Sequence, residues 1–192
     1  MQILQNKPLM IFTTLFLMMA ATRSHHFSSA LHLPDASLAV FFLAGFFIQR
    51  ILALPILLLT AGAIDYLSIT LGNTSGWCIS SAYWFLIPTY ALLWFGGRWY
   101  ASKHALRLKS IITLNATLFV STTVAFVISN GSFYTISGRY TDPNWTEYLE
   151  SFAMYYPSYL SSAFIYVGAI TVIYIILKAT PVFSTRKKSS NE

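Results

Sequence analysis

The strongest constraint on this chain is a series of long apolar runs that contain almost no charged residues. A helix that crosses the hydrocarbon core of a bilayer needs about 20 mostly apolar residues. Four runs are long enough and two shorter ones come close: residues 51–71, 77–97, 110–130 and 158–177, then 8–21 and 37–48. We therefore predict an all-α integral membrane protein whose six transmembrane helices form a single domain over residues 1–192.

The composition excludes a soluble globular domain and agrees with a lipid bilayer as the surroundings of the chain. Charged residues make up only 9% of the sequence and hydrophobic residues 56%, whereas a soluble domain carries about 25% charged residues. The formal net charge of +6 does not indicate a nucleic-acid partner, because the basic residues lie in loops and tails between the apolar runs. Their placement instead predicts the orientation of the helices.

Lysine and arginine are enriched in the cytoplasmic loops of membrane proteins. With both termini in the cytoplasm, the inner segments hold ten of the 12 basic residues, and the outer segments hold only Arg23 and Arg139. Most acidic residues fall on or near the outer side, and residues 139–150 are predicted to lie in a polar outer loop. Lys7 and the short apolar run up to Ala21 also resemble a secretory signal peptide, whose removal would leave the other five helices in the same orientation.

Asp65 is the only acidic residue inside a clear apolar run, and an ionisable residue at such a place is a candidate functional residue. Asp65 lies six residues before the outer end of the run 51–71, and Tyr83 lies six residues after the outer start of the run 77–97. At about 1.5 Å per residue, both are predicted to sit roughly 9 Å deep. Helices joined by a tight turn are usually adjacent, so the two side chains are predicted to meet in an outward-facing cavity. The alternative for Asp65 is a structural carboxyl group hydrogen-bonded to a neighbouring helix.

Cys78 is the only cysteine, so a disulfide within the chain is excluded. It lies near the start of the run 77–97, where a helix dipole favours the thiolate form. A thiolate is a soft ligand that suits transition metals. The alternative is a small hydrophobic side chain without a ligand role.

The predicted outer segments are rich in aromatic residues, and the chain lacks several motifs of other functions. Tyrosine and tryptophan there form either a belt at the headgroup level or a stacking surface for a large amphipathic ligand. The chain contains no C-x-x-C, H-E-x-x-H or Walker sequence. Zinc binding, covalent haem attachment and ATP hydrolysis by a Walker site therefore have no motif support.

Together these features resemble the BtuM-type cobalamin transporters. The resemblance depends on His26, Asp65, Cys78 and Tyr83, in the arrangement Asp65-x12-Cys78-x4-Tyr83, and on a length and predicted topology that match over the whole chain. The family is similar to the substrate-binding S-components of energy-coupling factor transporters. The resemblance therefore implies an S-component-like bundle in the inner (cytoplasmic) membrane of a bacterium.

The resemblance also implies a mechanism. Cobalamin is the transported ligand, the protein has no cofactor of its own, and the Cys78 sulfur ligates cobalt on its lower axial face. Asp65, Tyr83 and His26 surround the site, and the thiolate assists removal of cyanide from cyanocobalamin as an accessory reaction. The family is viewed as acting without the subunits of an energising module. Arg139, the outer-loop base near the aromatic cluster, is a candidate contact for the phosphate of the ligand.

Three alternatives stay open. An S-component-like transporter for another vitamin would not need Cys78. A membrane thiol enzyme would use Cys78 as nucleophile, His26 as base and Asp65 to orient the base. A small scaffold subunit would need neither Asp65 nor Cys78.

Overall fold

The chain is built from α-helices. A computed structural model describes residues 7–23, 34–71, 79–105 and 107–179. Within these ranges there are six α-helices, one 3₁₀ helix and no β-strand, which confirms the predicted all-α class. In chain order they are α2 (Lys7–Arg23), α4 (Ser37–Phe47), α5 (Ala53–Thr70), the 3₁₀ helix η2 (Ser81–Phe85), α6 (Leu86–Lys103), α7 (Leu108–Ile136) and α8 (Trp145–Ala179).

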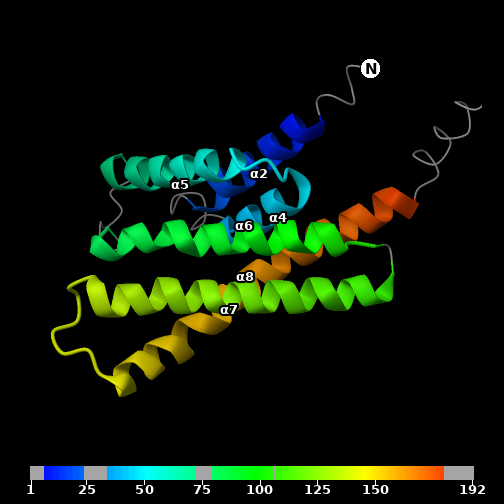
Figure 1. The fold of residues 1–192 in the computed structure, drawn as a ribbon. Helices are drawn as coiled ribbons and strands as arrows, with labels where there is room; N and C mark the ends of the chain where they lie inside the picture. The colour runs from blue at the N-terminus through cyan, green and yellow to red at the C-terminus, as the bar shows by residue number, and fades with distance from the viewer. Residues whose placement is uncertain (1–6, 24–33, 72–78, 106, 180–192) are drawn as a thin grey trace, which may run out of the picture.

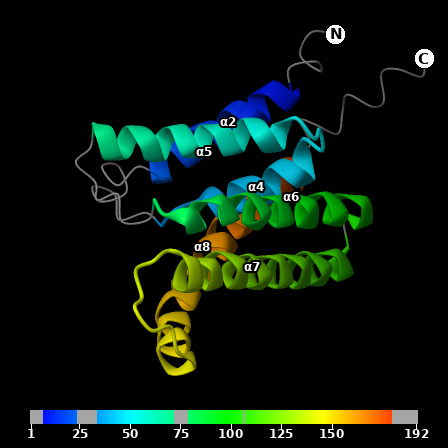
Figure 2. The ribbon, with the colours of Figure 1, turned by 60° about the vertical axis from the view of Figure 1, so that its left-hand side comes forward.

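Consecutive helices run in opposite directions along the bundle (Figure 1). The start of α2, the end of α8 and the connection from α6 to α7 lie on the same side in both views (Figures 1 and 2). We call this side the α6–α7 end. The opposite side, where α5 ends and η2 begins, is the α5–η2 end.

Three of the described helices are long and apolar enough to cross a membrane: α5, α7 and α8. Helices α2 and α4 are apolar but shorter, and α6 is less apolar because it includes Arg98 and Lys103. The outer surfaces of these helices expose large apolar side chains such as Leu59, Ile112 and Ile176. Exposure of this kind is unfavourable in water and fits a membrane protein.

Helix α4 lies at the centre of the bundle, in contact with α2, α5, α6 and α8. A helix that is apolar on every side is expected to be buried, and every residue of α4 from Ser37 to Gly45 is buried. With 11 residues, α4 is about 16 Å long at 1.5 Å per residue. This length is roughly half of the 30 Å hydrocarbon core, so space above the start of α4 is left for a cavity.

The contact between α4 and α6 depends on two glycines. A Cβ atom on Gly45 would lie 1.9 Å from the backbone oxygen of Trp94, and one on Gly97 would lie 1.9 Å from that of Phe42. The two helix backbones therefore approach more closely than any residue with a side chain would allow. Phe42 and Trp94 are both fully buried beside this contact, and α4 is held rigidly in place.

Two predicted boundaries are wrong. The run 77–97 is not one regular helix, because residues 81–85 form η2 and α6 then continues to Lys103. The polar segment 139–150 is a loop only in its first part, since α8 begins at Trp145 and extends 13 residues before the predicted span 158–177. Glu147 supports this early start, because its backbone N–H donates to Asn144 Oδ1 at 3.0 Å.

Candidate functional site

A cavity of about 660 Å³ lies at the α5–η2 end of the bundle, above the start of α4. Its floor contains the end of α2 and Asp35, which lies two residues before α4, together with parts of α5, η2 and α6. One wall is formed by α7, α8 and the loop between them. The volume falls within the range of about 300–1,000 Å³ that is typical of small-molecule sites. The short α4 leaves this space free, because η2, α7 and α8 supply residues that line the cavity and α4 itself supplies none.

An ion pair between Arg23 and Asp65 forms the centre of the floor. Arg23 Nε donates to Asp65 Oδ1 at 2.7 Å, and Nη2 donates to Oδ2 at 2.7 Å. The Arg23 side chain is only 8% exposed and that of Asp65 is 22% exposed. This fork-to-fork geometry is the strongest form of ion pair between side chains. Because both groups are withdrawn from water, removal of either would leave a buried charge without its partner.

Hydrogen bonds extend this pair to three further elements. Tyr83 Oη, on η2, donates to Asp65 Oδ2 at 2.8 Å. Arg23 Nη1 donates to Ser37 Oγ at 2.9 Å on α4 and to Tyr90 Oη at 2.6 Å on α6. The carboxylate of Asp35 lies 3.7 Å from Arg23 Nη1 and is half exposed. The network therefore ties α2, α4, α5, η2 and α6 together at a single point beneath the cavity.

The predicted meeting of Asp65 and Tyr83 is present in the structure as a direct hydrogen bond. The carboxyl group of Asp65 is also hydrogen-bonded to neighbouring helices, which is the structural alternative for this residue. Sequence reasoning missed Arg23, which was assigned to an outer loop. A signal for it was available, since an acidic residue within an apolar helix requires a cationic partner, and Arg23 is one of only two basic residues on the predicted outer side.

The remaining predicted site residues are placed differently or lie outside the described residues. His26 and Cys78 fall in residues 24–33 and 72–78, which the structure does not describe. The residue after Cys78, Ile79, lines the cavity. Arg139 is exposed and is not among the residues that line the cavity, although its neighbour Tyr140 is.

The α7–α8 wall of the cavity is aromatic. It is lined by Phe126, Phe133, Tyr140, Tyr155 and Tyr159. The ring of Phe126 packs edge-on against Tyr159, with 5.0 Å between centroids. Behind these residues, Thr123 Oγ1 and Tyr156 Oη are 2.7 Å apart, which holds α7 and α8 together. The wall thus offers flat apolar faces with hydroxyl groups at their edges, a combination that suits a large amphipathic ligand.

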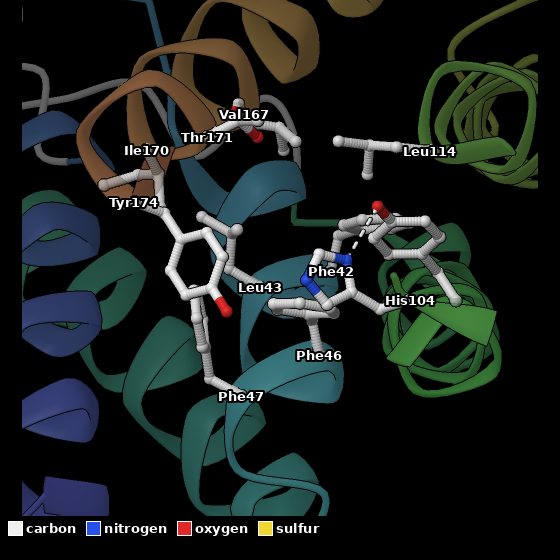
Figure 3. A pocket seen from close by; sticks show the side chains of 11 residues that line it. Phe42, Leu43, Phe46, Phe47, His104, Leu114, Val167, Ile170, Thr171 and Tyr174 are labelled. Carbon is white, nitrogen blue, oxygen red and sulfur yellow. Dashed lines mark hydrogen bonds between the residues drawn. The ribbon is translucent and has the colours of Figure 1, made fainter. Parts of the chain in front are cut away.

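A second, much smaller pocket of about 30 Å³ lies at the α6–α7 end. Figure 3 shows it between α4, α7, α8 and His104, with Phe42 and Phe46 from α4 on one side and Tyr174 from α8 on another. His104 Nδ1 is 3.1 Å from Tyr100 Oη, whereas its Nε2 is buried without a hydrogen-bond partner in the described part of the chain. This volume holds one or two water molecules and excludes any larger ligand.

Comparisons with known proteins do not identify a family. No protein-family model matches the chain, and no curated protein matches it. In addition, the described residues contain no cluster of three or more His, Cys, Asp or Glu side chains that could hold a metal ion. The function must therefore be argued from the geometry of the cavity and from the sequence.

Proposed function

We propose that this protein takes up cobalamin across the inner membrane of a bacterium, and that the cavity at the α5–η2 end binds the ligand. The observation that carries the proposal is the convergence of Asp65, Tyr83 and an aromatic wall on one cavity. Cys78 directly precedes a residue of that cavity, Ile79. A soft thiolate at this place is a suitable axial ligand for cobalt.

The chemistry of the cavity supports an amphipathic ligand with a large ring. Flat aromatic side chains such as Tyr155 and Phe133 offer stacking surfaces, and tyrosine hydroxyl groups offer hydrogen bonds. A corrinoid is larger than a drug-sized molecule, so it would fill the cavity and extend through its open side. In this proposal Asp65 and Arg23 hold Tyr83 in place on the floor beneath the ring.

The proposed topology has six spans, with both termini in the cytoplasm and the cavity on the outer side. The distribution of basic residues supports this orientation. The antiparallel order of the helices also supports it, because it puts the start of α2 and the end of α8 at the same end (Figure 1). The single cysteine makes the orientation testable without removing other thiols. A membrane-impermeant maleimide added to intact spheroplasts should label Cys78, and a Cys78→Ala variant should remain unlabelled.

The network around Asp65 also bears on the thiol-enzyme alternative. In that mechanism Asp65 would accept a hydrogen bond from His26 and orient it as a base. Asp65 already accepts three hydrogen bonds, one at Oδ1 from Arg23 and two at Oδ2 from Arg23 and Tyr83. This arrangement favours an anchoring role for Asp65 over the orientation of a base.

The first test is the visible absorption spectrum of purified protein. The protein is expressed with and without cyanocobalamin, purified in detergent and desalted. Wild-type protein is expected to retain the corrin with a spectrum shifted by sulfur ligation. Cys78→Ala and Cys78→Ser should lose the shift, because neither alanine nor a hydroxyl group replaces a soft thiolate.

Each outcome of this test separates the candidates. Corrin retained with identical spectra in the wild type and both variants would keep cobalamin binding but remove the thiolate from the mechanism. No corrin retained by the wild type would contradict the proposal and favour another vitamin or the thiol enzyme. Covalent modification of Cys78 by an acyl substrate would then distinguish these two.

A further inference from the structure

Asn130 is a polar residue of the cavity that takes no part in the network of the floor. It lies on α7, lines the α7–α8 wall, and its Oδ1 atom is buried without a hydrogen-bond partner among the described residues. A buried acceptor that lacks a partner is unfavourable. The terminal side-chain torsion of asparagine is broadly distributed in proteins, and rotation of the Asn130 amide breaks no hydrogen bond at Oδ1. The oxygen can therefore turn toward a ligand in the cavity.

The floor offers a contrasting environment, because Arg23 is already engaged inside the protein by the carboxylate of Asp65 and lies close to the half-exposed carboxylate of Asp35. The guanidinium group of Arg23 is hydrogen-bonded to Asp65, Ser37 and Tyr90. A ligand that binds through its own charge would have to compete with this bidentate pair. A neutral N–H donor on the ligand meets no such competition at Asn130, since Oδ1 has no bond to lose.

We propose that Asn130 is a specificity-determining residue that recognises a neutral primary carboxamide of the ligand by accepting its N–H at Oδ1. This inference rests on the proposed uptake of cobalamin, whose corrin ring carries such carboxamides around its edge. The ring stacks on the aromatic wall while one carboxamide reaches Asn130 on the same wall. Recognition at Asn130 therefore depends on a neutral hydrogen bond.

The decisive experiment separates the acceptor of Asn130 from its donor. Binding of cyanocobalamin is measured by titration calorimetry with the wild type, Asn130→Leu and Asn130→Asp. Leucine removes both groups. The affinity of Asn130→Leu for cyanocobalamin is expected to fall about tenfold, in line with the loss of one well-made hydrogen bond to a buried group. Aspartate keeps the acceptor and removes the donor, so the affinity of Asn130→Asp for cyanocobalamin is expected to stay within about threefold of that of the wild type.

A matched control comes from the same helix. Asn115 is exposed on α7, where its Nδ2 donates to the backbone oxygen of Ile111 at 2.8 Å. It is not among the residues of the cavity. Asn115→Leu makes the same chemical change on the lipid-facing surface and is expected to leave the affinity unaltered. Equal thermal unfolding midpoints for the variants at positions 115 and 130 confirm that each is folded.

A change in the ligand complements the changes at Asn130. Mild acid hydrolysis converts single carboxamides of cyanocobalamin into carboxylates, and the isomers are titrated separately. At least one isomer is expected to bind Asn130→Asp about tenfold more weakly than cyanocobalamin does, because two facing carboxylates have no hydrogen to share. The wild type can turn Nδ2 of Asn130 toward the carboxylate of the isomer, and Asn130→Leu has neither group, so both proteins should bind that isomer and cyanocobalamin within about threefold of each other.

The outcomes distinguish this inference from the function on which it rests. Wild-type binding that Asn130→Leu does not weaken overturns the inference alone. The same holds if Asn130→Asp loses affinity as Asn130→Leu does, because the acceptor would then not be the group in use. Absence of cyanocobalamin binding by the wild type overturns the proposed function and the inference together.

Discussion

The two ends of the helix bundle use similar residues but enclose very different amounts of space. At the α5–η2 end, tyrosines surround a cavity of about 660 Å³ above an ion pair. At the α6–α7 end, aromatic residues and His104 close around about 30 Å³ (Figure 3). The difference arises from α4, whose Phe46 and Phe47 fill the second end while Ser37 stops short of the first.

This comparison shows that polar residues within an apolar bundle have different consequences in open and closed surroundings. Arg23 and Asp65 satisfy one another and create a fixed polar floor with free space above it. His104 lies in a packed environment, where its Nε2 atom finds no partner. A binding site thus requires both a complete polar network and a void next to it, and only the α5–η2 end has both in the described part of the chain.

The largest expected loss of stability comes from breaking the Arg23–Asp65 ion pair at the α5–η2 end. Arg23→Leu leaves Asp65 charged and unpaired, so the free energy of unfolding should fall by about 3–5 kcal/mol. Unfolding by sodium dodecyl sulfate in mixed micelles measures this change. The double variant Arg23→Leu with Asp65→Leu removes both charges and should be more stable than Arg23→Leu alone. Equal losses in the two would contradict the pairing as the source of stability.

A smaller loss is expected at the contact that positions α4. Gly97→Ala puts a methyl group 1.9 Å from the backbone oxygen of Phe42, and forced separation of the helices should lower the free energy of unfolding by about 1–3 kcal/mol. Gly168→Ala is the matched control, because a Cβ there has no atom within 4 Å. Its unfolding free energy should not fall and should rise by up to about 1 kcal/mol, because alanine is the better helix former. Equal effects at both positions would show that α4 and α6 are not held by this contact.

Tyr83→Phe tests a single hydrogen bond of the network at the α5–η2 end. It removes the hydroxyl group that donates to Asp65 at 2.8 Å, and the free energy of unfolding should fall by about 1 kcal/mol. The exposed Tyr66 on α5 offers the control, since Tyr66→Phe removes a hydroxyl group outside the network. Circular dichroism during thermal unfolding measures both variants. A larger loss in Tyr66→Phe would contradict the role of the network.

The smallest change in stability is expected at the α6–α7 end. His104→Leu loses the contact with Tyr100 but also removes a buried nitrogen that has no partner, so the two changes should offset each other to within about 1 kcal/mol. The affinity for cyanocobalamin should not change, because His104 lies at the opposite end from the proposed site. Loss of affinity in His104→Leu would show that the two ends are coupled.

The helical class, the apolar surface and the meeting of Asp65 with Tyr83 could all be predicted from the sequence. These follow from local properties, since the length of an apolar run and the depth along two adjacent helices can be counted residue by residue. Residues 81–85 and 145–150 were predicted less well, because the boundaries of helices depend on contacts such as that between Glu147 and Asn144.

The full set of groups that surround the cavity, in contrast, depends on how the helices pack. Arg23 is 42 residues away from Asp65 in the sequence, and although an acidic residue in an apolar helix calls for a cationic partner, the local pattern does not indicate that Arg23 also reaches Ser37 and Tyr90. The same holds for the close approach of α4 and α6 at Gly45 and Gly97. Pairing between distant residues is set by how helices pack in space, and packing depends on all of their faces at once.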